Sequence, residues 1–175
     1  MGRGDEPGVM FVDVAQEAGL SAVTYCGSEE KAHLVESDGT GAAFLDYDGD
    51  GYLDIYMVNA WALQDGMPVV KGANLLYRNR GDGTFEDMTE RAGVGDRSWG
   101  GGVCAADYDN DGYIDLYVSN FGPNLLYHNN GDGTFTERAQ FAGVTDGGWS
   151  GNGAFLDYDN DGDLDILVLS RYSRP

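Results

Sequence analysis

The sequence DYDNDGYID at residues 107–115 decides how the rest of the chain is interpreted. It recurs as DYDNDGDLD at 157–165, which lies 50 residues further on, and as DYDGDGYLD at 46–54. A second motif, NLLYRNRGDGTF at 74–85, returns as NLLYHNNGDGTF at 124–135 with the same offset of 50. A period of roughly 20 to 50 residues is the signature of solenoids and propellers. The chain is therefore expected to be an array of repeated structural units.

The first repeat is longer than the second. Its Asp-rich motif begins at Asp46, 61 residues before Asp107, so it contains 11 more residues than the 50-residue period. These additional residues fall between Asn59 and Asn74, where the next repeat has only 120–124. We expect a single enlarged loop at this place.

The chain also enters the repeat pattern partway through a unit. The stretch FVDVAQEAGL at 11–20 matches FEDMTERAGV at 85–94 and FTERAQFAGV at 135–144. By this match, Phe11–Val14 should form the outermost strand of a unit, and AQEAGL could hold one helical turn. The third unit ends after DLDILVLS at 163–170, before any NLLY-type hairpin of its own.

Each repeat has the composition of β-structure. Apolar segments of four to eight residues, rich in Ile, Val and Tyr, precede and follow each Asp-rich motif, which is typical of strands. The NLLY segment and the Gly-Asp-Gly turn add a hairpin. Four short strands in about 50 residues match one blade of a β-propeller. The predicted fold is all-β, a partial β-propeller of about two and a half four-stranded blades.

We assign the whole chain, 1–175, to one repeat region. Its predicted parts are an outer strand and connection at 11–37, a first repeat at 38–89, a second repeat at 90–138 and a truncated third repeat at 139–175.

The Asp-rich motifs share the pattern D-x-D-x-D-G-x-x-D, which predicts calcium-binding loops. Ca²⁺ takes roughly 6 to 8 oxygen ligands, and positions 1, 3 and 5 of such a loop supply carboxylates while position 7 supplies a backbone carbonyl. Glycine at position 6 permits the sharp turn, and position 9 completes the ligand set. We predict up to three Ca²⁺ ions per chain, held by Asp46, Asp48, Asp50, Tyr52, Asp54, Asp107, Asp109, Asp111, Tyr113, Asp115, Asp157, Asp159, Asp161, Asp163 and Asp165.

Other interpretations of these loops are weaker. EF-hands are excluded because position 12, where a bidentate Glu belongs, holds Met57, Val118 and Val168, and strands flank the loops. Solvated acidic turns are disfavoured because four unneutralised carboxylates within a few Å repel one another. Mg²⁺ is a poorer candidate because it retains water and uses few protein ligands. Three Ca²⁺ ions would change the formal charge from -20 to -14.

The three Asp loops, together with the N-x-G-D-G-T-F hairpins at Asn79 and Asn129, resemble the FG-GAP/VCBS repeats of integrin-α-like propellers. They look most like the variant in cartilage-acidic-protein-like and ASPIC/UnbV proteins. The resemblance extends from Phe11 to about Ser170. It implies a seven-bladed propeller, extracellular placement and calcium in the blade loops. The remaining blades are accordingly expected in the full-length chain.

Composition excludes several classes of protein. With 30 Asp plus Glu against 10 Lys plus Arg, the chain repels phosphate, so we expect no nucleic-acid partner. No apolar run approaches the roughly 18 residues of a membrane span, so we expect no membrane insertion. The two cysteines, Cys26 and Cys104, are too few for a disulfide framework, and a bridge between them is disfavoured.

The remaining signals favour structural explanations. Arg-Gly-Asp occurs at Arg3–Asp5 and Arg80–Asp82, but the second copy falls in a repeated turn. Trp99 and Trp149 are repeat-equivalent, and we favour packing over sugar stacking. The two histidines, His33 and His128, have no spacing to a nucleophile. His128 occupies the hairpin position that Arg78 holds in the preceding repeat, which suggests a surface side chain.

The sequence thus predicts a calcium-binding scaffold, extracellular or at the cell surface or in the periplasm, that is not an enzyme and binds a protein or glycan ligand. One alternative is the propeller portion of a secreted enzyme, of the polysaccharide lyase or phospholipase type, with its chemistry elsewhere. A second alternative is a lectin-like propeller. We also expect apolar strand at 166–169 to be exposed and to promote self-association.

Overall fold

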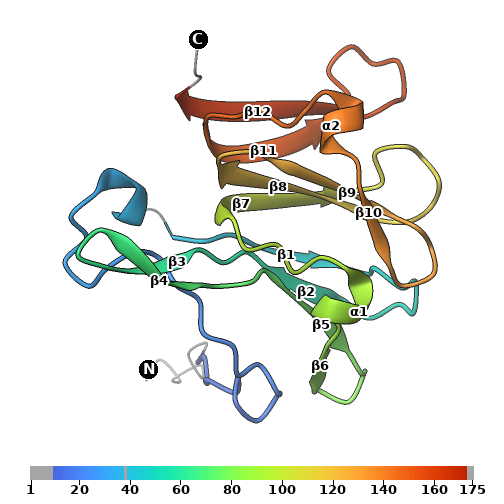
Figure 1. The fold of residues 1–175 in the computed structure, drawn as a ribbon. Coiled ribbons are helices and arrows are strands. Elements are labelled where there is room, and N and C mark those ends of the chain that lie inside the picture. Colours follow the sequence, from blue (N-terminus) through green and yellow to red (C-terminus); the bar gives the residue numbers. More distant parts are fainter. Residues whose placement is uncertain (1–9, 38, 173–175) are drawn as a thin grey trace, which may run out of the picture.

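The computed structural model describes residues 10–37 and 39–172, in which antiparallel strands form successive stacked sheets (Figure 1). The all-β class and the partial, open propeller are confirmed by this arrangement. Within the described residues the helices are short, because no segment carries a sustained helical pattern. They are the single turns η1 (Leu34–Ser37), α1 (Thr89–Ala92) and α2 (Ala139–Ala142).

The first two blades each contain four strands in sequential order. The first consists of β1 (Ala42–Leu45), β2 (Asp54–Met57), β5 (Leu75–Asn79) and β6 (Phe85–Asp87). The second consists of β7 (Trp99–Ala106), β8 (Asp115–Phe121), β9 (Leu125–Asn129) and β10 (Phe135–Glu137). α1 and α2 follow the outer strands of these blades and end at the left-handed residues Gly93 and Gly143.

The third blade contributes two strands, β11 (Trp149–Leu156) and β12 (Asp165–Tyr172). They pair along most of their length, whereas β11 pairs with β8 of the second blade only at Trp149 and Phe121. The sheets therefore meet mainly through their side chains, and their backbones form the stacked layers of Figure 1.

Strand alternation directs side chains into two separate cores between the blades. In β8, Leu116 and Val118 face the first blade, while Tyr117 between them faces the third. We call the layer between the first and second blades the first inter-blade core; it includes Tyr56, Leu76, Leu116 and Val118. The second inter-blade core lies between the second and third blades and includes Tyr117, Leu126, Phe155 and Ile166. The period of two that places residues on opposite sheet faces produces this division.

Equivalent tyrosines anchor the two cores. Tyr56 and Tyr117 are both fully buried, and each hydroxyl donates a hydrogen bond of 3.1 Å to a backbone oxygen, that of Val94 and Val144 respectively. Gly153 of β11 lies directly against the Tyr117 ring, where an added Cβ would be 2.9 Å from a ring carbon. The close approach of these blades therefore requires glycine at this position.

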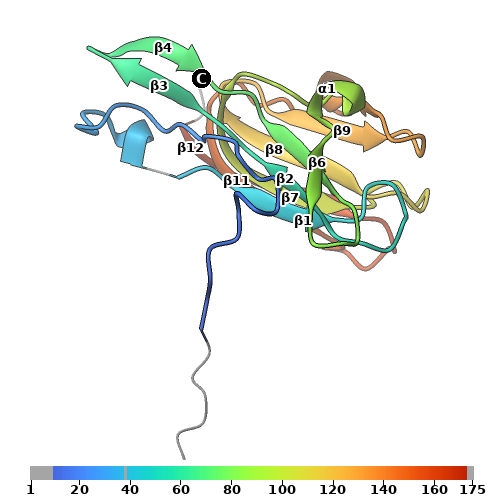
Figure 2. The ribbon, with the colours of Figure 1, turned by 90° about the horizontal axis from the view of Figure 1, so that it is seen from below.

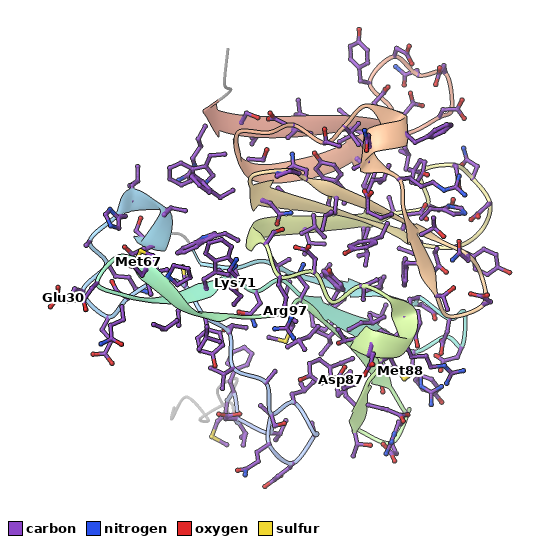
Figure 3. All side chains as sticks on the ribbon, viewed as in Figure 1. Glu30, Met67, Lys71, Asp87, Met88 and Arg97 are labelled. Carbon is purple, nitrogen blue, oxygen red and sulfur yellow. The ribbon has the colours of Figure 1, made fainter. Side chains whose placement is uncertain are left out.

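The enlarged loop of the first repeat is itself ordered as a hairpin, which goes beyond the sequence prediction. It contains β3 (Trp61–Gln64) and β4 (Met67–Lys71), which project away from the stacked sheets (Figure 2). Figure 3 labels Lys71 and Arg97 where the hairpin returns to the blades. Arg97 Nη1 donates to the Lys71 carbonyl at 2.8 Å, and Trp61 Nε1 donates to the Arg97 carbonyl at 2.7 Å. These bonds fix the base of the hairpin.

Residues 11–14, which the repeat match predicts to be an outermost strand, carry no strand in this structure, and Phe11 is 94% exposed. The repeat equivalents of this segment, β6 and β10, exist through pairing with β5 and β9, and no described strand pairs with residues 11–14. A strand of three or four residues has little stability without a partner. The following AQEAGL segment does form one turn, in which the Ala18 N–H donates to the Val14 carbonyl at 2.8 Å.

The outer face of the third blade leaves apolar side chains exposed. Leu167 and Leu169 of β12 are 52% and 61% exposed, and Leu156 of β11 is 40% exposed. The residue equivalent to Leu167 in the second blade is Tyr117, which the third blade buries completely. The prediction that apolar side chains of 166–169 are exposed therefore holds for Leu167 and Leu169. Ile166 and Val168 instead pack into the second inter-blade core.

Candidate metal centre

The three Asp loops occupy equivalent places in the three blades. They connect β1 to β2, β7 to β8 and β11 to β12, and they lie along the same side of the stack, at the right of Figure 1. The repeat therefore gives each innermost strand the same acidic loop at the same end.

The first carboxylate of each loop organises the backbone in the same way. One oxygen of Asp107 accepts the Asp111 N–H at 3.0 Å, and the other accepts the Gly112 N–H at 2.9 Å. The carboxylate at position 5 then accepts the N–H of position 7. Asp46 and Asp50 make the same bonds in the first loop, and Asp157 and Asp161 make them in the third.

Two positions of each loop require a left-handed backbone, although the sequence prediction identified only one of them. Position 6 is glycine in all three loops, with φ values between 88° and 97° at Gly51, Gly112 and Gly162. Position 4 also has positive φ: 73° at Gly49, 58° at Asn110 and 59° at Asn160. Asparagine tolerates this conformation better than other residues with a side chain, which explains the choice of Gly or Asn at position 4.

The carboxylate at position 9 is buried in the first two loops. Asp54 accepts the Tyr47 N–H at 3.0 Å and the Asn79 N–H at 2.7 Å, so it links its loop to the neighbouring hairpin. Asp115 makes the equivalent bonds to Tyr108 and Asn129 at 3.1 and 2.7 Å. Both side chains are inaccessible to solvent. Asp165 accepts the Tyr158 N–H at 3.0 Å but is exposed, since it lies in the third blade.

Burial determines the electrostatics of these carboxylates. Removal from water raises the pKa of Asp54 to about 6, against the hydrogen bonds from Asn79 and Tyr47 that lower it. Burial likewise raises the pKa of Asp115 to about 6, with the Asp109 charge adding to the effect. Burial and then the Asp50 charge raise the pKa of Asp48. A cation in the loop would relieve this cost, because it favours the charged form of each group.

The ligand atoms converge as a metal site needs. Groups of three potential ligand atoms, all within 4.8 Å of one another, occur in every loop: Asp46, Asp48 and Asp50; Asp107, Asp109 and Asp111; Asp157, Asp159 and Asp165. Hard carboxylate oxygens at this density fit Ca²⁺. Each group contains three of the four Asp side chains predicted for its loop; Asp54, Asp115 and Asp161 lie outside these three groups.

Position 7 serves a structural purpose besides its predicted carbonyl. The rings of Tyr52 and Tyr113 lie against the Gly-Asp-Gly turns, where a Cβ at Gly81 or Gly131 would be 2.7 or 2.6 Å from ring carbons. In the third loop, Asp163 instead accepts a bond of 3.2 Å from the Asn110 side chain of the second. The hairpin turns and Asp loops are thus built to pack together.

The prediction that His128 is a surface side chain is wrong. Its side chain is only 13% exposed, and its Nδ1 lies 3.1 Å from Asp109 Oδ2 and 3.5 Å from Asp115 Oδ1. The ring also stands edge-on to Tyr108, with centroids 6.4 Å apart. The third strand of a blade directs this side chain under the Asp loop, and the equivalent Arg78 likewise reaches toward Asp48, with Nη1 and Oδ2 3.9 Å apart. That shared position is the signal that could have identified His128.

The weaker sequence signals have structural explanations. In the Arg80–Asp82 copy of Arg-Gly-Asp, Asp82 Oδ1 accepts the Thr84 N–H and hydroxyl, which closes the turn; the Arg3–Asp5 copy lies outside the described residues. Trp99 is buried edge-on against Trp61, and Trp149 packs edge-on against Phe121. Cys26 and Cys104 are not joined by a disulfide.

In the metal-free chain, the melting temperature is expected to rise as the pH falls from about 7.5 to about 5.5. Asp54 and Asp115 have a pKa of about 6 in the folded chain against an ordinary value of 3.8. The folded chain therefore binds more protons in this range, and the resulting stabilisation is lost as the pH rises through about 6. Thermal scans in EDTA at several pH values measure the effect. Replacing both residues with Asn should flatten the dependence, and a melting temperature that falls with acidification would contradict it.

Among the described residues, no helix has the length and apolar character needed to cross a membrane.

Comparison with known proteins supports the family resemblance drawn from the sequence. The model of the FG-GAP-like repeat matches residues 46–118 and 107–168, which contain all three Asp loops. A stretch of 54 residues, 30% of this chain, is 48% identical to cartilage acidic protein 1 of Homo sapiens and 44% identical to the proteins of that name in Xenopus tropicalis and Mus musculus. The matched stretch spans 8% of the length of these relatives. The resemblance inferred from the Asp loops and hairpins is confirmed, and the chain belongs to the FG-GAP-like repeat family.

Proposed function

We propose that this chain is a calcium-stabilised extracellular scaffold that presents a surface for a protein or glycan ligand and performs no catalysis itself. The observation that carries the proposal is the same hydrogen-bonded Asp loop in three copies, each gathering carboxylates within 4.8 Å. Without a bound cation, the carboxylates of each loop would repel one another. In each blade, the residues that would hold Ca²⁺ are the Asp side chains at positions 1, 3, 5 and 9 and the carbonyl at position 7.

The role of calcium would be structural. In the first two loops the ligands also bond to the hairpin of the same blade, since Asp54 accepts the Asn79 N–H and Asp115 accepts the Asn129 N–H. Asn129 additionally donates from its side chain to the Tyr47 carbonyl of the first loop at 2.8 Å. Neutralising the carboxylates would therefore stabilise the strands within a blade and the contact between two blades.

The family membership and the similarity to cartilage acidic protein 1 support placement outside the cell, where Ca²⁺ is abundant. The same evidence favours a scaffold over an enzyme. Among the described residues, His128 faces carboxylates of the Asp loop. Within the part of the chain that the structure describes, its buried Nδ1 has no hydrogen bond to a hydroxyl or thiol nucleophile that it could activate as a general base. The secreted-enzyme alternative then requires chemistry elsewhere. A glycan array probed with and without EDTA would distinguish a lectin-like propeller from a protein-binding one.

Calcium titration by calorimetry tests the proposal directly. The 175-residue chain should bind up to three Ca²⁺ ions, and Asp48→Asn should remove one of them. The matched control is Asp82→Asn, which changes an exposed carboxylate in the hairpin turn and should leave the stoichiometry unchanged. The absence of any bound Ca²⁺ at about 2 mM, a concentration well above the Kd of extracellular modules, would refute the proposal.

A further inference from the structure

The second Asp loop differs from the other two because a histidine nitrogen is directed into it. His128 lies on β9, and its Nδ1 completes a group with Asp109 and Asp115 in which all ligand atoms lie within 4.8 Å of one another. We propose that this loop binds a transition-metal ion of the Zn²⁺ class, with His128 Nδ1, Asp109 and Asp115 as ligands. The inference rests on the proposed function only in that the second loop holds a cation.

The distances between the atoms lie within about 0.2 Å of those expected around one shared ion. Ligands at roughly 2.0–2.2 Å around a tetrahedral Zn²⁺ stand about 3.3–3.6 Å apart. His128 Nδ1 is 3.1 Å from Asp109 Oδ2 and 3.5 Å from Asp115 Oδ1. Asp109 also belongs to the group of Asp107, Asp109 and Asp111, so the two groups share one carboxylate.

The surroundings of Nδ1 argue that a ligand is missing from this nitrogen. The atom is fully buried, and despite its nearness to Asp109 it has no hydrogen bond of acceptable geometry. Leaving a buried polar nitrogen unsatisfied is costly. An ion between the imidazole and the two carboxylates would use the nitrogen lone pair and neutralise Asp115, whose side chain is inaccessible to solvent.

The chemistry of the donors separates this loop from a pure calcium site. Ca²⁺ selects oxygen ligands, whereas Zn²⁺ binds imidazole nitrogen and carboxylate oxygen together. Imidazole is a good ligand for Zn, Cu, Fe and Ni. The second loop therefore has the carboxylate oxygens found in all three loops. His128 adds an imidazole nitrogen, which favours Zn²⁺ and the other transition-metal ions.

The first blade provides an internal contrast. Arg78 occupies the position equivalent to His128, and its Nη1 lies 3.9 Å from Asp48 Oδ2. A guanidinium remains charged and offers no lone pair to a metal. The same place in the two blades thus holds a permanent cation in one and a potential ligand in the other.

Calorimetric titration with Zn²⁺ in the presence of about 2 mM Ca²⁺, a competing concentration for an extracellular site, tests the inference. The chain should bind one Zn²⁺ ion. Co²⁺ bound at the same site should give the intense visible d–d bands that are typical of tetrahedral coordination. Both His128→Gln and His128→Arg should weaken Zn²⁺ binding by at least about 10–100-fold, the loss that follows when only an outer-shell partner is removed. His33→Gln is the control, since it removes the other histidine of the chain and should change nothing.

The reverse exchange provides an independent test. Arg78→His should add a second Zn²⁺ ion in the first loop, because it copies the second loop's donor set. Nitrogen-detected NMR of the unmutated chain avoids any effect of substitution on folding: Zn²⁺ should shift the ring-nitrogen resonances of His128 and leave those of His33 in place.

Failure of this inference is distinguishable from failure of the calcium proposal. Unchanged Zn²⁺ affinity in His128→Gln, an unshifted His128 ring, or no Zn²⁺ binding while Ca²⁺ binds would overturn it. Zn²⁺ binding that depends on His128, in a chain that binds no Ca²⁺, would support it and refute the calcium proposal alone.

Discussion

Removal of calcium with EDTA is expected to lower the melting temperature of the 175-residue chain by roughly 10–20 °C. At about 2 mM Ca²⁺ and an assumed Kd of about 0.1 mM, each site contributes about 1.8 kcal/mol, and three independent sites contribute about 5 kcal/mol. In a chain of this length, each kcal/mol corresponds to roughly 2–4 °C. Differential scanning calorimetry in calcium and in EDTA measures the shift, and equal melting temperatures would contradict the prediction.

A matched pair of variants separates metal binding from loss of hydrogen bonds. Asp107 accepts two backbone N–H groups and faces the acidic cluster, whereas Asp132 accepts the Thr134 N–H and hydroxyl in a hairpin turn. In calcium, Asp107→Asn should lower the melting temperature by roughly 4–7 °C, the equivalent of one site. In EDTA it should cost less, because the substitution also relieves repulsion with Asp109 and Asp111. Asp132→Asn should have the same effect in both solutions.

The chain is also expected to self-associate at tens of micromolar. The outer face of the third blade exposes Leu156, Leu167 and Leu169, and Phe44 at the opposite end of the stack is 68% exposed. Inside the stack, the equivalent sheet faces are buried against a neighbouring blade. The two exposed end faces should therefore pack against another copy of the chain in a similar way. Exposed apolar strands of this kind promote association. Sedimentation velocity over a range of concentrations should show species larger than a monomer.

The surface responsible can be identified by substitution. The double change Leu167→Lys and Leu169→Lys should return the chain to a monomer, since it places two charges on the outer face of the third blade. Met67→Lys with Val69→Lys is the control: both residues are as exposed as the leucines but lie on β4 of the projecting hairpin. A monodisperse monomer of the unmutated chain, or rescue by the control pair, would refute the role of the third blade.

The sequence predicted the Asp loops and most strands because their information is local and repeated. A loop such as 107–115 carries its Asp side chains and its glycine in one short stretch between apolar runs, so the motif can be identified from local sequence alone. The third repeat also copies the second at a fixed offset, which identified β11 and β12 without any structural knowledge.

What the sequence did not reveal depends on contacts between segments. The position of His128 follows from the way β9 lies beside the Asp loop, and nothing near residue 128 indicates an acidic neighbour. Phe11–Val14 matched the outer strands of the later repeats in sequence, yet a strand also requires a partner. The β3–β4 hairpin was invisible as a repeat because residues 61–71 have no counterpart in the second blade.

The separation of the two inter-blade cores gives the chain the behaviour of a short linear polymer. Each core joins one pair of adjacent blades, and strand alternation in β8 and β9 keeps their side chains apart. The free energy of unfolding is then approximately a sum of blade terms and nearest-neighbour coupling terms. The third blade, which is coupled on one face and contributes only the two strands β11 and β12 to the described residues, should open first and most often, so its amides should exchange with solvent fastest. A substitution at Leu76 would weaken the junction of the first two blades while leaving the exchange rates of β11 and β12 largely unaltered.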